Sequence, residues 1–145
     1  KEKYPYRLWD ANWGSQSMVV LSRLPDCEMK FDRMIGMQPA VIRFKPKGSE
    51  QSHDLYVIHT LSPTWPGERV HMRNRQFYRL AATINKSPDQ PTIVMSDFNT
   101  SPWSQIFRRL LSSTELIDTR AYRGYLASWP SFISDFGIPI DHVLV

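Results

Sequence analysis

The chain has 145 residues, of which 41% are apolar and 12% aromatic, and it carries a formal net charge of +4 with a sequence pI of about 9.4. This length corresponds to one domain, and the composition supplies a hydrophobic core, which excludes an intrinsically disordered chain. Lysines and arginines are scattered rather than clustered. The charge therefore suits a polyanionic substrate such as a phosphodiester but falls short of a nucleic-acid-binding footprint.

The single cysteine, Cys27, excludes an intramolecular disulfide framework and a metal site made of several cysteines, and we interpret it as structural. No apolar run approaches the roughly 18 residues of a membrane span, and no signal segment opens the chain. The chain starts on Lys1 rather than on methionine and stops inside the apolar stretch "HVLV". We therefore expect it to be a piece of a longer protein.

Several segments have the composition of buried or half-buried strands. The polar link "KGSEQSH" joins two of them and favours a hairpin. In "DLYVIHT", alternation places Leu55, Val57 and His59 on one face of a strand. The predicted strands cover residues 18–24, 40–46, 54–60, 92–96 and 138–145.

Helical spacing follows a proline-rich loop and predicts a helix over residues 70–85. Three arginines mostly lie off its apolar stripe, where they form a solvated face or reach phosphates: Arg73, Arg75 and Arg79. The stripe itself consists of Val70, Phe77, Leu80, Ala81 and Ile84.

A second helix is predicted to begin with Ser101 as its N-cap and Pro102 as its first residue. Its apolar residues recur at the spacing of one buried face, so we expect Trp103 in the core. That face consists of Trp103, Ile106, Phe107, Leu110 and Leu111. Strands that are joined both by hairpins and by a helix imply a mixed sheet, which makes the fold class α/β or α+β.

The stretch "SDFN" follows the strand at 92–96 and carries the first candidate site residues, Asp97 and Asn99. In an extended segment the two side chains point the same way, about 6.5–7 Å apart. A carboxylate can bind a metal or take a proton, and an amide can donate to an anion. Ligand sites of α/β sheets favour the carboxyl ends of strands. The alternative is a turn, because Asp and Asn are common turn residues.

Two more candidates stand in predicted strands. His59 closes "LYVIHT", where it is either a catalytic or a structural histidine. Asp141 lies in the apolar stretch "GIPIDHVLV", and an unpaired buried carboxylate is costly, so we expect a specific partner for it. An imidazole is one such partner, and a backbone or arginine partner is the alternative. His142 points to the opposite face and is expected to lie outside this constellation.

Four segments resemble, in order and rough spacing, the endonuclease/exonuclease/phosphatase superfamily with its DNase-I-like fold: "VIHTLSPT", "RNRQFYRLAATI", "IVMSDFNTSPWSQIFRRLL" and "SWPSF…GIPIDHVLV". The resemblance is closest to membrane-anchored bacterial members and covers residues 54–145, with a weaker likeness at 18–25. It implies an α+β fold, namely a partial four-layer α/β sandwich with mixed sheets flanked by helices. The expected organisation is a single truncated domain over residues 1–145.

The resemblance also implies roles. Asp97 is expected to activate the attacking water or to hold the metal ion, although Ser96 replaces the glycine that usually precedes it. Asn99 is expected to hydrogen-bond the scissile phosphate, and His59 to donate to a phosphate oxygen. Asp141 is expected to orient a catalytic histidine near the end of the domain.

The same resemblance implies an upstream asparagine and metal-binding glutamate and a downstream Ser-Asp-His segment, none of which we find in these residues. The expected function is that of a metal-dependent phosphoesterase, with Mg²⁺ or Mn²⁺, acting on nucleic acid, a phosphoinositide or a small phosphate ester. The piece alone is expected to be inactive and to self-associate. A non-catalytic binding or scaffold domain is the alternative, and the extracytoplasmic face of a bacterial inner membrane is the expected location.

Further substrate contacts are expected near the site. Trp129 in "ASWPSF" either lines the substrate cleft or packs in the core. Trp65 and Arg69 stand in the loop that follows His59, and loops of this kind often supply substrate contacts.

Overall fold

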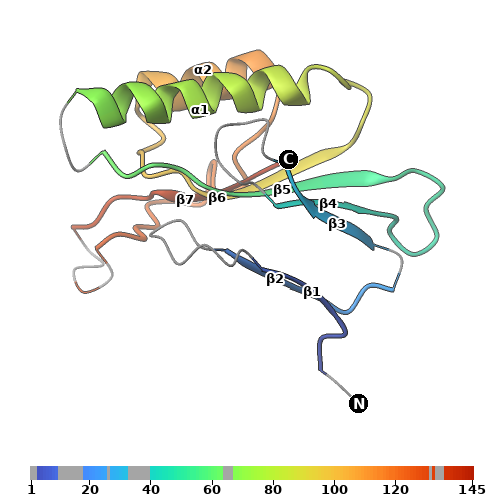
Figure 1. Ribbon diagram of the computed structural model, residues 1–145. Helices are drawn as coiled ribbons and strands as arrows, with labels where there is room; N and C mark the ends of the chain where they lie inside the picture. Colours follow the sequence, from blue (N-terminus) through green and yellow to red (C-terminus); the bar gives the residue numbers. More distant parts are fainter. Residues whose placement is uncertain are drawn as a thin grey trace.

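The computed structural model describes residues 3–9, 18–25, 27–32, 40–63, 67–130, 132 and 136–145. Within these residues a helical layer covers a mixed sheet (Figure 1). In chain order the elements are β1 (Tyr6–Trp9), β2 (Val19–Ser22), β3 (Cys27–Phe31), β4 (Ala40–Phe44), β5 (His53–His59), α1 (Glu68–Ile84), β6 (Thr92–Asp97), α2 (Gln105–Thr114) and β7 (Asp141–Leu144).

The larger sheet has the strand order β3-β4-β5-β6-β7. Strands β5 and β6 are parallel and connected through α1, whereas the other neighbours are antiparallel. Strands β1 and β2 form a separate antiparallel pair. Figure 1 shows both helices on one face of the larger sheet and the β1–β2 pair on the other side. The mixed sheet expected from the sequence is confirmed.

The main core lies between the helices and the larger sheet. Strand β5 alternates, with Asp54, Tyr56 and Ile58 buried and the residues between them half-buried. Because neighbouring strands keep register, Val94 and Leu144 continue this helix-facing side of the sheet. The buried cluster consists of Val41, Tyr56, Ile58, Phe77, Leu80, Ala81, Ile84, Val94, Phe98, Ile106, Phe107, Leu110 and Leu144.

The predicted strands and the hairpin between β4 and β5 are all present, with boundaries that differ by a few residues. Two strands, β1 and β3, have no counterpart among the predicted elements. Both alternate between exposed and half-buried residues and bury little, so they lack a strong apolar signal.

The expected start of the second helix is wrong. Its N-cap is Ser104, whose side-chain oxygen accepts the Phe107 N–H at 3.3 Å, and residues 102–103 form a turn before it. Trp103 therefore lies outside the helix, and it is 57% exposed rather than in the core. Its ring stacks on Tyr125 with the centroids 6.0 Å apart.

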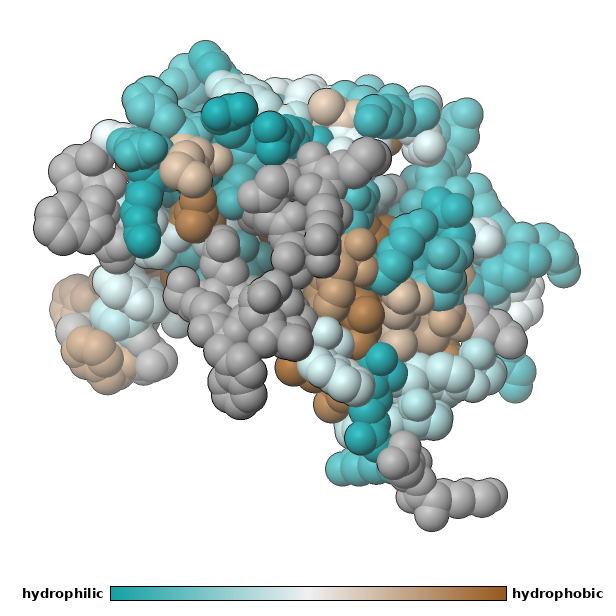
Figure 2. Space-filling model, viewed as in Figure 1, coloured by the Kyte–Doolittle hydropathy of each residue, from teal (hydrophilic) through white to brown (hydrophobic). Residues whose placement is uncertain are grey.

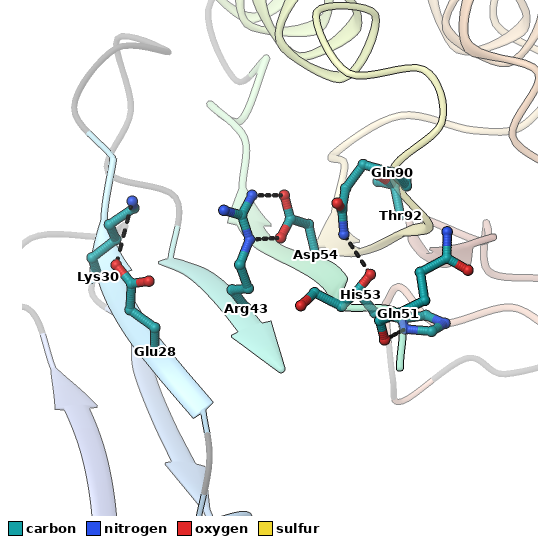
Figure 3. A network of polar contacts seen from close by, with 9 residues as sticks. Glu28, Lys30, Arg43, Gln51, His53, Asp54, Gln90 and Thr92 are labelled. Atoms are coloured by element: carbon teal, nitrogen blue, oxygen red, sulfur yellow. Dashed lines mark hydrogen bonds and ion pairs between the residues drawn. The ribbon is translucent and has the colours of Figure 1, made fainter. Parts of the chain in front are cut away.

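An ion pair connects β4 and β5 at the end of the sheet where β5 begins. Arg43 donates two hydrogen bonds to the buried Asp54, at 2.7 and 2.8 Å, and Figure 3 shows the two side chains facing each other across β4 and β5. This carboxylate raises the pKa of Arg43. The opposite end of β5, at His59, carries the candidate site.

Neither helix in the described part of the chain is long and apolar enough to cross a membrane. Figure 2 shows hydrophilic residues over the helix layer and apolar residues gathered beneath it. Strands β1, β2 and β6 each carry large hydrophobic side chains that are exposed, namely Trp9, Val19, Leu21 and Met95.

Candidate active site

Three polar side chains form a row across the end of the larger sheet. His59 is the register partner of Asp97 in the parallel β5–β6 pair, and Asp97 is the register partner of Asp141 in the antiparallel β6–β7 pair. Residues directly opposite each other share one face of a sheet. The Nε2 atom of His59 lies 3.6 Å from Oδ2 of Asp97, and each side chain is about one-third exposed.

Asn99 joins this row through a turn rather than through an extended strand. Strand β6 ends at Asp97, whose Oδ1 accepts the Asn99 N–H at 2.8 Å, and Asn99 has a positive φ of 47°. Asparagine tolerates this left-handed conformation better than most residues do. The expectation that strand alternation orients Asp97 and Asn99 is therefore wrong, although the two residues do lie together.

Phe98, between the two polar residues, anchors the turn in the core. It is fully buried, and its ring centroid lies 5.2 Å from that of Phe77 and 5.5 Å from that of Phe107. Its N–H donates to the carbonyl of Ile140 at 2.8 Å, next to Asp141. The strong burial of one aromatic side chain thus positions a carboxylate and an amide at the surface.

The Asn99 side chain connects the turn to the end of β5. Its Nδ2 donates to the carbonyl of Thr60, the residue after His59, at 2.9 Å. The N–H of Thr60 in turn donates to the carbonyl of Asp97 at 3.0 Å. These bonds connect Thr60, the residue after His59, to both Asp97 and Asn99.

Arg73 of α1 supports the turn from behind, and the expectation of a solvated arginine face is wrong for this residue. Arg73 is 8% exposed, and its Nη1 donates to the carbonyl of Asn99 at 2.9 Å. Burial lowers the pKa of its guanidinium. Arg75 and Arg79 are exposed, as the sequence predicts. The missed signal is the spacing, because Arg73 precedes Phe77 by four residues and so shares its helix face.

The electrostatics of the row are dominated by Asp97. Burial is the main cause that raises the pKa of this carboxyl group above its ordinary value, and the negative charge of Asp141 raises it further. The hydrogen bond from the Asn99 N–H and the nearby His59 imidazole both act to lower the pKa. Two neighbouring carboxylates with one imidazole beside them favour a bound proton or cation.

Asp141 is not buried as its apolar surroundings led us to expect. It lies at the exposed start of β7, where alternation turns its side chain away from the core. Its N–H donates to Oγ of Ser128 at 3.2 Å, and its carbonyl accepts Nη1 of Arg120 at 2.6 Å. Arg120 is a neighbour that the sequence analysis missed.

His142 lies on the opposite face, as predicted. Its Nδ1 is 2.7 Å from Oδ2 of Asp118, and both residues are buried. This pair packs beside Phe107, whose ring centroid is 4.5 Å from that of His142. The pair stabilises the loop that precedes Arg120 and does not face the row.

The other predicted contacts are less closely tied to the row. Trp129 is 57% exposed, which excludes core packing. Its backbone forms an isolated antiparallel β-bridge with Ile138, shortly before β7. Arg69 is exposed in the first turn of α1 rather than in a loop. Trp65 lies outside the described residues.

The donors present fit part of a divalent-metal site. Within the described residues, no group of three or more His, Cys, Asp or Glu side chains is arranged to hold a metal ion. Asp97 and Asp141 nevertheless form a facing pair with a raised pKa at Asp97. Magnesium is commonly held by one or two carboxylates, with waters and substrate phosphates completing its shell.

Comparison with protein families matches residues 5–145 to the Endonuclease/Exonuclease/phosphatase family. The match covers almost the whole chain, so the protein belongs to this family, whose members are hydrolases that act on phosphate esters. A comparison with curated proteins found no significant match.

Solved structures share the fold. The catalytic domain of human nocturnin, with a bound sulfate anion, has 19% identity and a TM-score of 0.57, over 87% of this chain and 50% of that one. A mannosyl-6-phosphatase from Bacteroides thetaiotaomicron has 16% identity and a TM-score of 0.55, over 73% and 41%. Beta toxin from Staphylococcus aureus with bound magnesium ions has 13% identity and a TM-score of 0.55, over 74% and 41%.

The likeness to these structures confirms the DNase-I-like fold class that the sequence motifs imply. The chain spans half or less of the length of each of these three proteins.

Proposed function

We propose that this chain carries part of the active site of a metal-dependent phosphoesterase, which hydrolyses a phosphodiester or a phosphomonoester. One observation carries the proposal: His59, Asp97 and Asp141 form a row at one end of the sheet, and Asn99 is bonded to Asp97. The mannosyl-6-phosphatase and the sulfate-bound nocturnin domain, both with this fold, support a site for a tetrahedral anion.

In the proposed reaction, the oxygen of a water molecule forms a bond to phosphorus, the ester P–O bond breaks, and the leaving oxygen takes up a proton. Asp97 orients the water and accepts its proton, which its raised pKa favours. His59 and the Asn99 amide donate to phosphate oxygens, where charge develops in the transition state. Asp141 has the role of orienting a catalytic imidazole that is not among the described residues.

A divalent cation, Mg²⁺ or Mn²⁺, would be held by Asp97, with Asp141 on the neighbouring strand. When bound, such an ion supplies positive charge to the phosphate oxygens and lowers the pKa of a bound water. The bound magnesium ions in beta toxin support this cofactor. Because the negative charge of Asp141 raises the pKa of Asp97, a cation held at Asp97 would offset that repulsion.

Substrate contacts are proposed for Trp129 and Arg69. Trp129 is exposed and directly follows Ser128, whose Oγ accepts the Asp141 N–H. Arg69 is exposed at the start of α1, the helix that follows the strand ending at His59. The substrate is a phosphate ester, whether nucleic acid, phosphoinositide or a small ester.

The test is hydrolysis of bis-p-nitrophenyl phosphate and p-nitrophenyl phosphate by the full-length protein with Mg²⁺ or Mn²⁺. Removing one essential general base or oxyanion donor costs about 10²–10⁴-fold in rate, so Asp97→Ala and Asn99→Ala should each lose at least that much. Asp89→Ala, on the exposed turn after α1, should keep the wild-type rate. Wild-type turnover by Asp97→Ala would contradict the proposal.

A non-catalytic binding domain is the second candidate. It is favoured by one observation, namely that the described residues hold no complete metal-ligand group. In that case, the protein would bind phosphate esters without metal-dependent turnover of either substrate. We further propose that the protein acts at the extracytoplasmic face of a bacterial inner membrane, a proposal that fractionation with an epitope-tagged protein would test.

A further inference from the structure

Arg120 lies at the same end of the sheet as the row of site residues. Residues 117–119 run antiparallel beside β7, with the Ile117 N–H donating to the Val145 carbonyl at 2.7 Å and the Thr119 N–H to the Val143 carbonyl at 2.9 Å. This segment therefore extends the larger sheet beyond β7. In this register Thr119 lies opposite Val143, so Arg120 comes level with His142, the residue after Asp141. The guanidinium of Arg120 reaches back to the carbonyl of Asp141, which brings it to the Asp141 end of the row.

The position of Arg120 is held by two independent contacts. Its Nη1 donates to the carbonyl of Asp141 at 2.6 Å, and its backbone N–H donates to Oδ1 of Asp118 at 3.0 Å. Oδ2 of Asp118 is bound in turn to the buried His142. A guanidinium held at both its backbone and its tip has lost most of its conformational freedom before any ligand arrives, which favours binding.

The Arg120 guanidinium retains donors and charge for a ligand. It has five N–H donors, and the described residues supply one acceptor, the Asp141 carbonyl. The ion pairs of the described residues do not include Arg120, in contrast to Arg43, which is paired with Asp54. Arg120 also lines a surface hollow of about 350 Å³ together with Asp97 and Asp141.

We propose that Arg120 binds a non-bridging oxygen of the substrate's phosphate group. Without Arg120, a phosphate at the row would face two carboxylates, Asp97 and Asp141, and the proposed donors His59 and Asn99 both lie at the end away from Asp141. Arg120, at the Asp141 end, offsets that repulsion, and its planar donor array matches phosphate oxygens. This inference rests on the proposed phosphoesterase function and names a residue that determines its affinity for the phosphate group.

The alternative is that Arg120 only satisfies the Asp141 carbonyl. The two roles are separated by titrating the ¹⁵N-labelled chain with inorganic phosphate in the presence of Mg²⁺ and following the Nε–H signal of Arg120 and the amides of residues 97–99. Phosphate binding at the row should shift both sets of signals with one dissociation constant. A shift of the amides without any shift of the Arg120 Nε–H would overturn the Arg120 assignment.

Variants give the second readout. Because a charge-assisted hydrogen bond is lost, Arg120→Gln should weaken phosphate binding about tenfold, and Arg120→Lys, which keeps the charge without the fork, should weaken it less. Arg123→Gln is the matched control, because Arg123 is exposed three residues further along the same loop, and it should bind as the wild type does. If Arg120→Gln does not fold, the wild-type Nε–H signal still decides.

The outcomes separate the two proposals. If phosphate shifts residues 97–99 and Arg120→Gln binds it with unchanged affinity, the Arg120 assignment is wrong and the phosphoesterase proposal stands. If phosphate shifts neither residues 97–99 nor Arg120 in the wild type, the proposed phosphate site is itself contradicted.

Discussion

The half-buried carboxyl group of Asp97 is costly to ionise in the folded chain. Because its pKa is raised, mainly by burial, the folded protein holds the proton at this group more tightly than the unfolded chain does. The contribution of this group to stability is therefore fully present below its unfolded pKa and is lost as the pH rises through the folded pKa.

We predict that Asp97→Asn makes the protein more stable than the wild type at pH 7, and that the difference disappears below an unfolded pKa of about 3.9. The amide oxygen can still accept the Asn99 N–H, so the turn is retained. Urea unfolding at both pH values measures the effect. Lower stability of Asp97→Asn than of the wild type at pH 7 would contradict the raised pKa of Asp97. Asp89→Asn, on an exposed turn, is the control. A residue that costs stability but is required for turnover is typical of a functional site.

Arg73 gives a second prediction for a single residue. Arg73→Met leaves the Asn99 carbonyl without its donor, so we expect a loss of about 1–3 kcal/mol in the free energy of unfolding. Amide hydrogen exchange should accelerate at residues 98–100 in particular. Arg75→Met, on the exposed face two residues away, should change neither quantity. Unchanged exchange in Arg73→Met would show that the turn does not depend on this contact.

The sequence predicted the members of the row better than it predicted their geometry. His59, Asp97, Asn99 and Asp141 were all singled out, and the structure brings them together. The turn at Asn99 was the alternative that the residue types offered, and it is the one present. The exposure of Asp141 was not predicted, because it depends on neighbouring strands rather than on local spacing. The burial of Arg73 was predictable from its spacing to Phe77 on one helix face. Arg120 was missed because its partner is the backbone carbonyl of Asp141, which no side-chain pattern marks.

At the scale of elements, helix α2 begins after the N-cap Ser104 rather than after the predicted N-cap Ser101. The pair Ser101-Pro102 has the residue types of a helix start, but Ser104 makes the capping bond to the Phe107 N–H. The Ser104 hydroxyl also accepts a hydrogen bond from the Thr100 hydroxyl at 3.0 Å, which connects the turn after Asn99 to the helix.

We therefore predict that Ser104→Ala destabilises the protein by about 0.5–2 kcal/mol, the usual range for loss of an N-cap. Ser101→Ala should be nearly neutral, since the side chain of Ser101 makes no hydrogen bond within the described residues. Thermal and urea unfolding of the two variants provide the comparison. Equal destabilisation by both substitutions would contradict the observed helix start.

Elements with strong periodicity were predictable, and elements with weak burial were not. Helix α1 and strands β5 and β6 follow clear apolar patterns and carry most of the buried cluster. Strand β1 has no fully buried residue, and neither has β3, so what places them is pairing with a neighbour: β2 for β1 and β4 for β3. Such pairing joins separate segments and leaves little trace in local composition.

At the scale of the whole molecule, apolar side chains remain exposed beneath the helix-covered sheet. Val19 is 64% exposed, Leu21 49% and Met95 43%. The β1–β2 pair consists of two strands within the described residues, so each presents an unpaired edge. Exposed apolar strands with unpaired edges are templates for association with another chain.

We propose that the isolated chain self-associates through this surface. Size-exclusion chromatography with light scattering should give a mass that rises with concentration toward at least twice 17.0 kDa. Val19→Lys should reduce the association, whereas Tyr122→Lys, on a fully exposed loop residue, should not. A monomer at all concentrations would contradict the proposal.

The order of the strands in the larger sheet was the largest feature that the sequence pattern did not predict. The motifs indicate a mixed sheet, but only the order β5-β6-β7 brings His59, Asp97 and Asp141 into one row. The order and register arise from packing of the whole sheet against α1 and α2, which is a property of the complete fold.

The most direct test of the central claim is a titration of the ¹⁵N-labelled chain with Mn²⁺, followed by paramagnetic broadening of the amide signals. We predict that the amide signals of residues 59, 97, 99 and 141 broaden first and together. Asp97→Asn should abolish this pattern, and Asp89→Asn should leave it intact. Broadening centred elsewhere, or a pattern that Asp97→Asn does not change, would contradict a metal-assisted phosphoesterase site at this end of the sheet.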